Sequence, residues 1–113
     1  MAITNALITQ TPAAVYTSTG NNAITTLIIC NTATFNPVSP AENQTYLYLY
    51  VVPNGGTAAS PPLSSIIVNK LVIPAGESVL FDREKMVLSN GDMIVAKSDV
   101  PENLVITIST LAV

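Results

Sequence analysis

The chain has 113 residues, which is enough for one domain with one sandwich-sized core. Its residues are 49% hydrophobic and only 10% charged, whereas an average globular protein has about 25% charged residues, so disorder is disfavoured. The net charge is −3 and the four cations form no basic run, so we expect no nucleic-acid partner.

The charged side chains are unevenly distributed along the chain. Residues 1–41 carry no charge at all, and every charged residue lies from Glu42 onward. Two interpretations stay open: this segment is buried or covered by a neighbour, or it is a docking segment. Its first part contains Ile3, Leu7 and Ile8, which we take as interface candidates. Residues 1–20 are then either an N-terminal arm or a strand added to a neighbouring subunit's sheet.

Prolines and β-branched runs predict short strands throughout the first half of the chain. We expect a strand over residues 3–9, with a continuation over 14–17 left open. Residues 23–31 predict a strand that is apolar on both faces and therefore central. On this strand Ile24, Ile28 and Cys30 are expected to alternate with Leu27 and Ile29. The lone Cys30 is expected to be a small, buried and unreactive side chain.

Residues 45–52 give the clearest strand pattern. Side chains alternate along a strand, so this pattern predicts one aliphatic face and one tyrosine face. The aliphatic residues are Leu47, Leu49 and Val51, and the tyrosines are Tyr46, Tyr48 and Tyr50. The tyrosines either form a protein interface or fill a second core face, and the sequence favours neither.

The second half continues the pattern of short strands and turns. Strands are expected over residues 63–73, 78–81, 93–97 and 104–110, with a helical turn over 82–86 capped by Asp82. The last strand should point Leu104, Ile106 and Ile108 inward. The whole chain, residues 1–113, is therefore predicted to be all-β: an antiparallel β-sandwich or jelly-roll-like domain of seven or eight short strands.

The residues that usually carry catalysis and metal binding are scarce. There is no histidine, one cysteine and no phosphate-binding glycine loop, so we expect no enzyme, no cofactor and no metal. A calcium site or an acid pair among the late carboxylates is conceivable, but interleaved cations favour solvated loop charges. These carboxylates are Asp82, Glu84, Asp92, Asp99 and Glu102, and the cations are Arg83, Lys85 and Lys97. No secretory signal or membrane span is recognisable, so no membrane partner is expected.

Several segments resemble small virion proteins of tailed bacteriophages. The resemblance covers roughly residues 24–110 and is carried by the segment LYVVPNGGTA at 49–58, the strand at 66–70, the turn at 74–77, the Leu88-x-x-Gly91-Asp92-x-Ile94 element and the alternating strand at 104–109. The chain departs from these proteins in its uncharged N-terminal extension and its tyrosine-rich strand. The resemblance supplies no catalytic residues to carry over.

The resemblance implies a non-catalytic virion structural protein, made in the host cytoplasm and most consistent with a capsid decoration (cement) protein. Its expected partners are the major capsid protein and copies of itself. Two alternatives stay open: a tail or baseplate subunit, and a carbohydrate-binding β-sandwich for host adhesion. Copy number per particle would separate decoration from a tail component.

Overall fold

The computed structural model describes residues 2–39, 41–82, 86–100 and 103–113, and the regular secondary structure of these residues is almost entirely β-strand. One short 3₁₀-helix, η1, covers Leu63–Ser65. The strands are β1 Ala2–Leu7, β2 Ala13–Thr17, β3 Asn22–Asn31, β4 Thr45–Val52, β5 Ile66–Ile73, β6 Ser78–Phe81, β7 Met86–Leu88, β8 Met93–Ser98 and β9 Leu104–Ala112.

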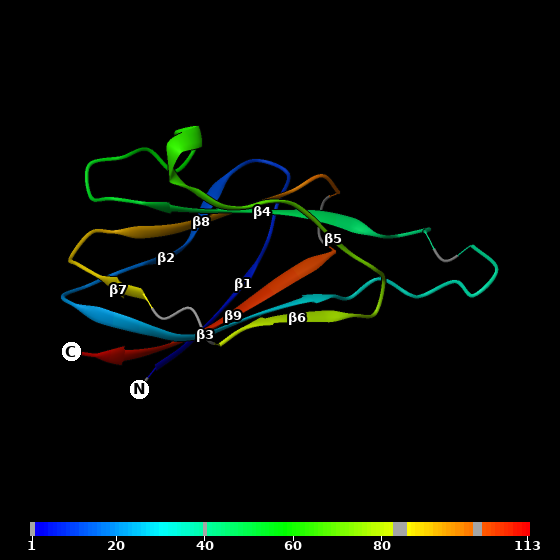
Figure 1. Ribbon diagram of the computed structural model, residues 1–113, viewed down its shortest axis with the longest axis horizontal. Helices are drawn as coiled ribbons and strands as arrows, with labels where there is room; N and C mark the ends of the chain where they lie inside the picture. The colour runs from blue at the N-terminus through cyan, green and yellow to red at the C-terminus, as the bar shows by residue number, and fades with distance from the viewer. Residues whose placement is uncertain (1, 40, 83–85, 101–102) are drawn as a thin grey trace.

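The strands form two antiparallel sheets packed face to face, which confirms the predicted β-sandwich. The first sheet has the order β1-β9-β3-β6, with β7 also paired to β3, and the second has the order β2-β8-β4-β5. In Figure 1 the first sheet is the lower layer and the second is the upper layer, with both chain ends at the same end of the domain. The edge strands β1 and β2 come from the start of the chain, and β5 and β6 form the opposite side.

The core lies between the two sheets and is filled by alternate residues of the central strands. On β9 the buried and half-buried positions alternate, and Leu104, Ile106 and Ile108 point inward as predicted. On β4, Leu47 and Leu49 are fully buried in the same core. Burying each such side chain is worth roughly 1.5–3 kcal/mol relative to leaving it exposed.

A bulge in β3 changes which of its residues reach the core. The pairing of β3 with β9 shifts between Ile24 and Thr26, so one extra residue is inserted there. Ile24 therefore lies on the core side with Leu27 and Ile29, and its predicted grouping with Ile28 and Cys30 was wrong. The strand is central in its sheet, as expected, but its second apolar face is the outer face of the sandwich.

Two other sequence-based expectations differ from the structure. β1 pairs along its whole length with β9 of the same chain, and β2 pairs with β8, so residues 2–7 and 13–17 belong to the domain's own sheets. The turn at Thr9 to Pro12 separates two strands of different sheets. The predicted helical turn over residues 82–86 lies mostly outside the described residues, and its last residue, Met86, begins the strand β7.

A fully buried asparagine ties the strand ends together at one end of the sandwich. The side-chain amide of Asn31 donates to the carbonyl oxygens of Asn43 (3.0 Å) and Ile73 (2.8 Å). Its Oδ1 accepts the N–H of Ala33 at 3.0 Å. Because each of these groups would otherwise be short of a partner, Asn31 fixes the end of β5 and the loop before β4 against β3.

Candidate interaction surfaces

The tyrosines of β4 lie on the outer face of the second sheet, and we call this surface the tyrosine face. Tyr46 and Tyr48 are half-buried, and a lysine ammonium lies over each ring. Lys70 Nζ is 5.1 Å from the ring centroid of Tyr46, and Lys97 Nζ is 4.9 Å from that of Tyr48. At these distances the cations are attracted by the ring quadrupoles. The tyrosine face therefore combines aromatic area with positive charge.

Tyr50 differs from the other two tyrosines because the domain covers it itself. It is buried in a small second cluster with Val52 and Val95, on the outer side of the second sheet. Ala58 and Ile66, which belong to the connection after β4 and the start of β5, pack against this cluster. Each of the two interpretations of the β4 tyrosines therefore holds for part of the strand. Tyr50 lies in a local core, and Tyr46 and Tyr48 lie at the surface.

The outer face of the first sheet can be assigned from the strand pairing. Residues directly opposite one another in an antiparallel pair point to the same face. On β9 the buried residues point inward, so Val105, Thr107 and Ser109 point outward, and their partners on β1 and β3 do the same. The outward set is Ile3, Asn5 and Leu7 of β1; Val105, Thr107, Ser109 and Leu111 of β9; Ala23, Thr26, Ile28 and Cys30 of β3; Ser78 and Leu80 of β6; and Val87 of β7.

None of these outward residues carries a charge, and we call this surface the uncharged face. It contains several large apolar side chains that are open to solvent, including Ile3 (68% exposed), Leu80 (57%) and Val87 (66%). Charged residues begin at its rim, where Glu77 and Asp82 stand directly before and after β6. Large exposed apolar patches with polar rims mark interaction sites on soluble proteins.

The N-terminal interface candidates separate into two groups. Ile3 and Leu7 point outward on β1 and belong to the uncharged face. Ile8 is 0% exposed and lies in the main core, so in the folded domain it presents no surface to a partner. The difference follows from strand alternation, because Ile8 comes directly after the outward Leu7 and its N–H donates to the carbonyl oxygen of the buried Leu104 at 2.9 Å.

Cys30 also lies on the uncharged face, which corrects its predicted burial. It is only half-buried and is paired with Val105 on one side and Ser78 on the other. The alternation of β3 explains the difference, because the fully buried Ile29 uses the inward position next to it. The alternating pattern of β9 predicted which of its residues point outward. It did not predict that these residues share one face with residues of β1, β3 and β6, because that depends on the strand order.

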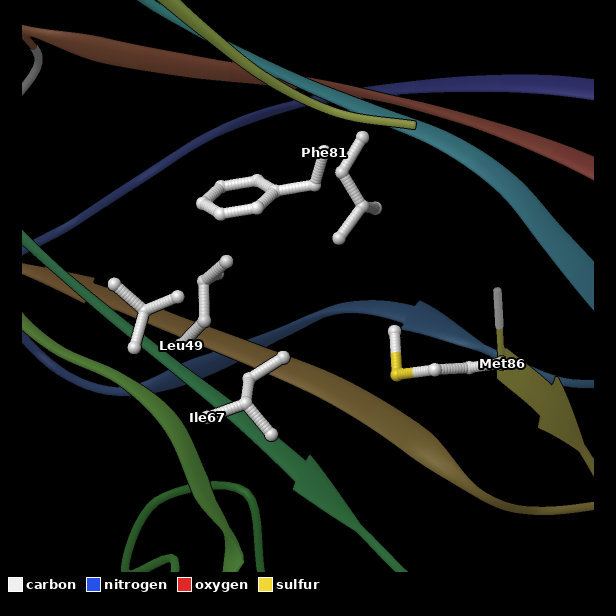
Figure 2. A pocket seen from close by; sticks show the side chains of 6 residues that line it. Leu49, Ile67, Phe81 and Met86 are labelled. Atoms are coloured by element: carbon white, nitrogen blue, oxygen red, sulfur yellow. The ribbon is translucent and has the colours of Figure 1, made fainter. Parts of the chain in front are cut away.

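An apolar cavity of about 400 Å³ opens between the sheets on the side of β5, β6 and β7. Leu27, Phe81 and Met86 line it from the first sheet, and Leu49, Ile67 and Val68 line it from the second. Figure 2 shows the side chains of Leu49, Ile67, Phe81 and Met86 around the space between the two layers. All of these side chains are apolar, so the cavity lacks the few placed polar groups that usually orient a small ligand.

Asp92 and Asp99, two of the described late carboxylates, accept backbone N–H groups. Asp92 accepts the N–H of Asn54 with Oδ1 and that of Ser89 with Oδ2, each at 2.9 Å. Asp99 Oδ1 accepts the N–H of Tyr46 at 2.7 Å. Within the described residues, no three His, Cys, Asp or Glu side chains gather where they could hold a metal ion. Glu84 and Glu102 lie outside the described residues.

Two comparisons of the sequence with known proteins found no match. No protein-family model matches the chain, and no curated protein sequence matches it either. Over the described residues, no helix has the length and hydropathy needed to cross a membrane.

Proposed function

We propose that this protein is a non-catalytic virion structural protein, most consistent with a capsid decoration protein that binds a shell through protein–protein contacts. The observation that carries the proposal is the uncharged face. A monomer gains nothing from exposing Ile3, Leu80 and Val87 on one face of a sheet in water, whereas an assembled subunit buries them. Protein that binds the assembled shell better than its separate subunits stabilises that shell by mass action.

The strand order supports the same proposal. The pairs are nested along the chain, with β1 on β9, β2 on β8, β3 on β6 and β7, and β4 on β5. This nested pairing is that of one long antiparallel hairpin that folds over on itself. Some of its strand pairs then lie in the first sheet and the others in the second. If β6 and β7 are counted as one interrupted strand, each sheet has four strands, and we infer a jelly roll. Viral capsid subunits and lectins use this architecture, and architecture alone does not choose between them.

The tyrosine face favours protein contact over glycan binding. A sugar-binding aromatic ring needs an open face for stacking, but lysines lie over the rings of Tyr46 and Tyr48. Tyrosine is, in contrast, enriched at protein interfaces relative to the rest of the surface. The two faces together give one subunit two chemically different surfaces, as a protein that bridges neighbouring subunits requires.

Copy number in purified particles tests this function. Particles would be purified through two density gradients from a host that produces this chain, and the chain would be quantified against the major capsid protein by mass spectrometry with isotope-labelled peptides. We expect hundreds of copies per particle. A few copies per particle would replace decoration by a tail or baseplate role. Absence from particles that contain all other structural proteins would overturn the virion proposal.

A further inference from the structure

We propose that the uncharged face is the contact surface for a second copy of this chain, paired about a twofold axis to give a dimer of two stacked sandwiches. This inference deepens the proposed function, because it names the occupant of the surface on which that function rests. The face lies on the side of the first sheet away from the second sheet, so a second copy placed there would not disturb the core (Figure 1).

The charge pattern favours a copy of the same chain as the occupant. In a twofold contact each residue near the axis meets itself or a close neighbour, so any charged residue there would face a like charge. The uncharged face has no such residue, whereas the tyrosine face carries Lys70 and Lys97. Only the first of these two surfaces can be laid on itself without repulsion between like charges.

The apolar character of the face agrees with this occupant. Interfaces between identical subunits that stay together are more apolar than interfaces that form and dissociate, and resemble a domain core cut in half. On the uncharged face Leu80 stands more than half exposed beside the half-buried Ile28, and Val87 stands more than half exposed beside Ala23. On the tyrosine face the exposed large aliphatic residue of β5 is Val72, at 40%.

The size of the face is sufficient for a specific dimer. Strands spaced by about 4.8 Å and rising about 3.3 Å per residue, with the lengths of β1, β9, β3, β6 and β7, give a projected area of roughly 500 Å². Pairing two such faces removes about 1,000 Å² or more from water, which reaches the lower limit of specific protein interfaces.

Sedimentation of the purified full-length chain over a concentration series tests the proposal with one disruptive variant and one matched control. Leu80→Lys places a charge at an exposed position of β6 on the uncharged face, and Val72→Lys makes a similar change on the edge strand β5 of the tyrosine face. We expect a dimer for the unmodified chain and for Val72→Lys. Leu80→Lys should weaken association at least about 30-fold, because it would place an unpaired charge in an apolar contact, while its circular dichroism stays that of the folded domain.

Cys30 gives a second measurement that needs no variant. Its half-buried thiol lies on the uncharged face, so a second copy should shield it. We expect its labelling rate with a thiol reagent to fall as the protein concentration rises through the association range. This readout still applies if Leu80→Lys does not fold.

The results separate this inference from the proposed function. A monomer or a trimer at all concentrations, an equal loss of dimer in both variants, or a labelling rate that does not depend on concentration would each overturn the second copy as occupant. If the chain is monomeric and Leu80→Lys alone loses binding to particles, the uncharged face binds a different protein and the virion function stands. If the chain forms the dimer but is absent from particles, this inference stands and the proposed virion function is wrong.

Discussion

The ammonium group of Lys97 lies 4.9 Å from the ring centroid of Tyr48, and the two residues are direct partners across β8 and β4. Their side chains point to the same side of the second sheet because directly opposed residues share a face. The second cation of the tyrosine face reaches Tyr46 from a different strand, β5, where Lys70 adopts a positive φ of 59° at a bulge. Two separate strands thus place one lysine over each exposed tyrosine.

The Lys97–Tyr48 contact should be measurable as a coupling energy. In a double-mutant cycle with Lys97→Ala and Tyr48→Ala, followed by chemical denaturation, we expect a coupling of about 0.5–1 kcal/mol, as for a cation–π pair near the surface. The control cycle pairs Lys97→Ala with Tyr46→Ala, because Lys70 covers Tyr46. Equal coupling in both cycles would show that the lysine acts through general charge effects and not through the ring of Tyr48.

Removing both exposed rings should weaken particle binding without unfolding the domain. If the uncharged face is paired in a dimer, the tyrosine face is the broad surface left for the shell, so Tyr46→Ser with Tyr48→Ser should reduce binding to particles lacking this protein by at least about 10-fold. Leu63→Ser is the control, since Leu63 is 75% exposed in η1. Unchanged binding of the double variant in a co-sedimentation assay would exclude the tyrosine face as the shell contact.

Asn31 should be among the most sensitive polar positions in the chain. Asn31→Ala leaves the carbonyl oxygens of Asn43 and Ile73 and the N–H of Ala33 without this partner. The hydrogen bond to Ile73 is buried, and those to Asn43 and Ala33 are partly buried. Since a buried unsatisfied group costs about 1–3 kcal/mol, we expect a loss of about 2 kcal/mol in the free energy of unfolding. Asn36→Ala, in an exposed loop where Asn36 binds Glu42, should cost less than about 1 kcal/mol. Similar denaturant midpoints for the two variants would contradict the role assigned to Asn31.

A metal chelator should leave the thermal midpoint unchanged. Both carboxylate oxygens of Asp92 already accept backbone N–H groups, and one oxygen of Asp99 does so. A bound ion at 100 times its Kd would add about 2.7 kcal/mol, so its removal would lower the midpoint by several degrees. Calorimetry with and without chelator, and with added calcium, is the measurement. A drop that calcium restores would reveal an ion site that these hydrogen bonds do not predict.

Local patterns predicted all the strands except β7, but the composition of each surface depended on the sheet order. The alternation of Leu47 and Leu49 with Tyr46 and Tyr48 placed β4 correctly, because a period of two is a property of the strand itself. That β1, β9, β3 and β6 lie side by side comes from long-range pairing, which one sequence does not reveal.

Bulges and buried loops account for the remaining differences. The extra residue at Thr25 moved Ile24 to the core side, and no residue type there signals a bulge. Tyr46, Tyr48 and Tyr50 were expected to lie together, either in an interface or in a second core face, but the connection after β4 packs against Tyr50 alone. The burial of Cys30 and Tyr50 therefore depends on tertiary packing and does not follow from their residue types.

The N-terminal strand gives the sharpest test of the fold against the arm interpretation. Deleting Ala2 to Gln10 removes all of β1 and the fully buried Ile8, and it leaves β9 as an unpaired edge. Loss of one large core side chain alone costs about 2–5 kcal/mol, and a domain of this kind has only about 5–15 kcal/mol in total. We therefore expect the truncated chain to lose cooperative unfolding and near-native circular dichroism.

Ile3→Thr is the matched control for this deletion, because Ile3 points outward on β1 and is 68% exposed. Made in the Leu80→Lys background, where self-association is weakened, it should change the free energy of unfolding by no more than about 0.5 kcal/mol, as surface substitutions usually do. In the unmodified background the same change should weaken the dimer, since Ile3 lies on the uncharged face. A truncated chain that unfolds cooperatively near the full-length midpoint would show that β1 is a dispensable arm and that Ile8 contributes little to the core.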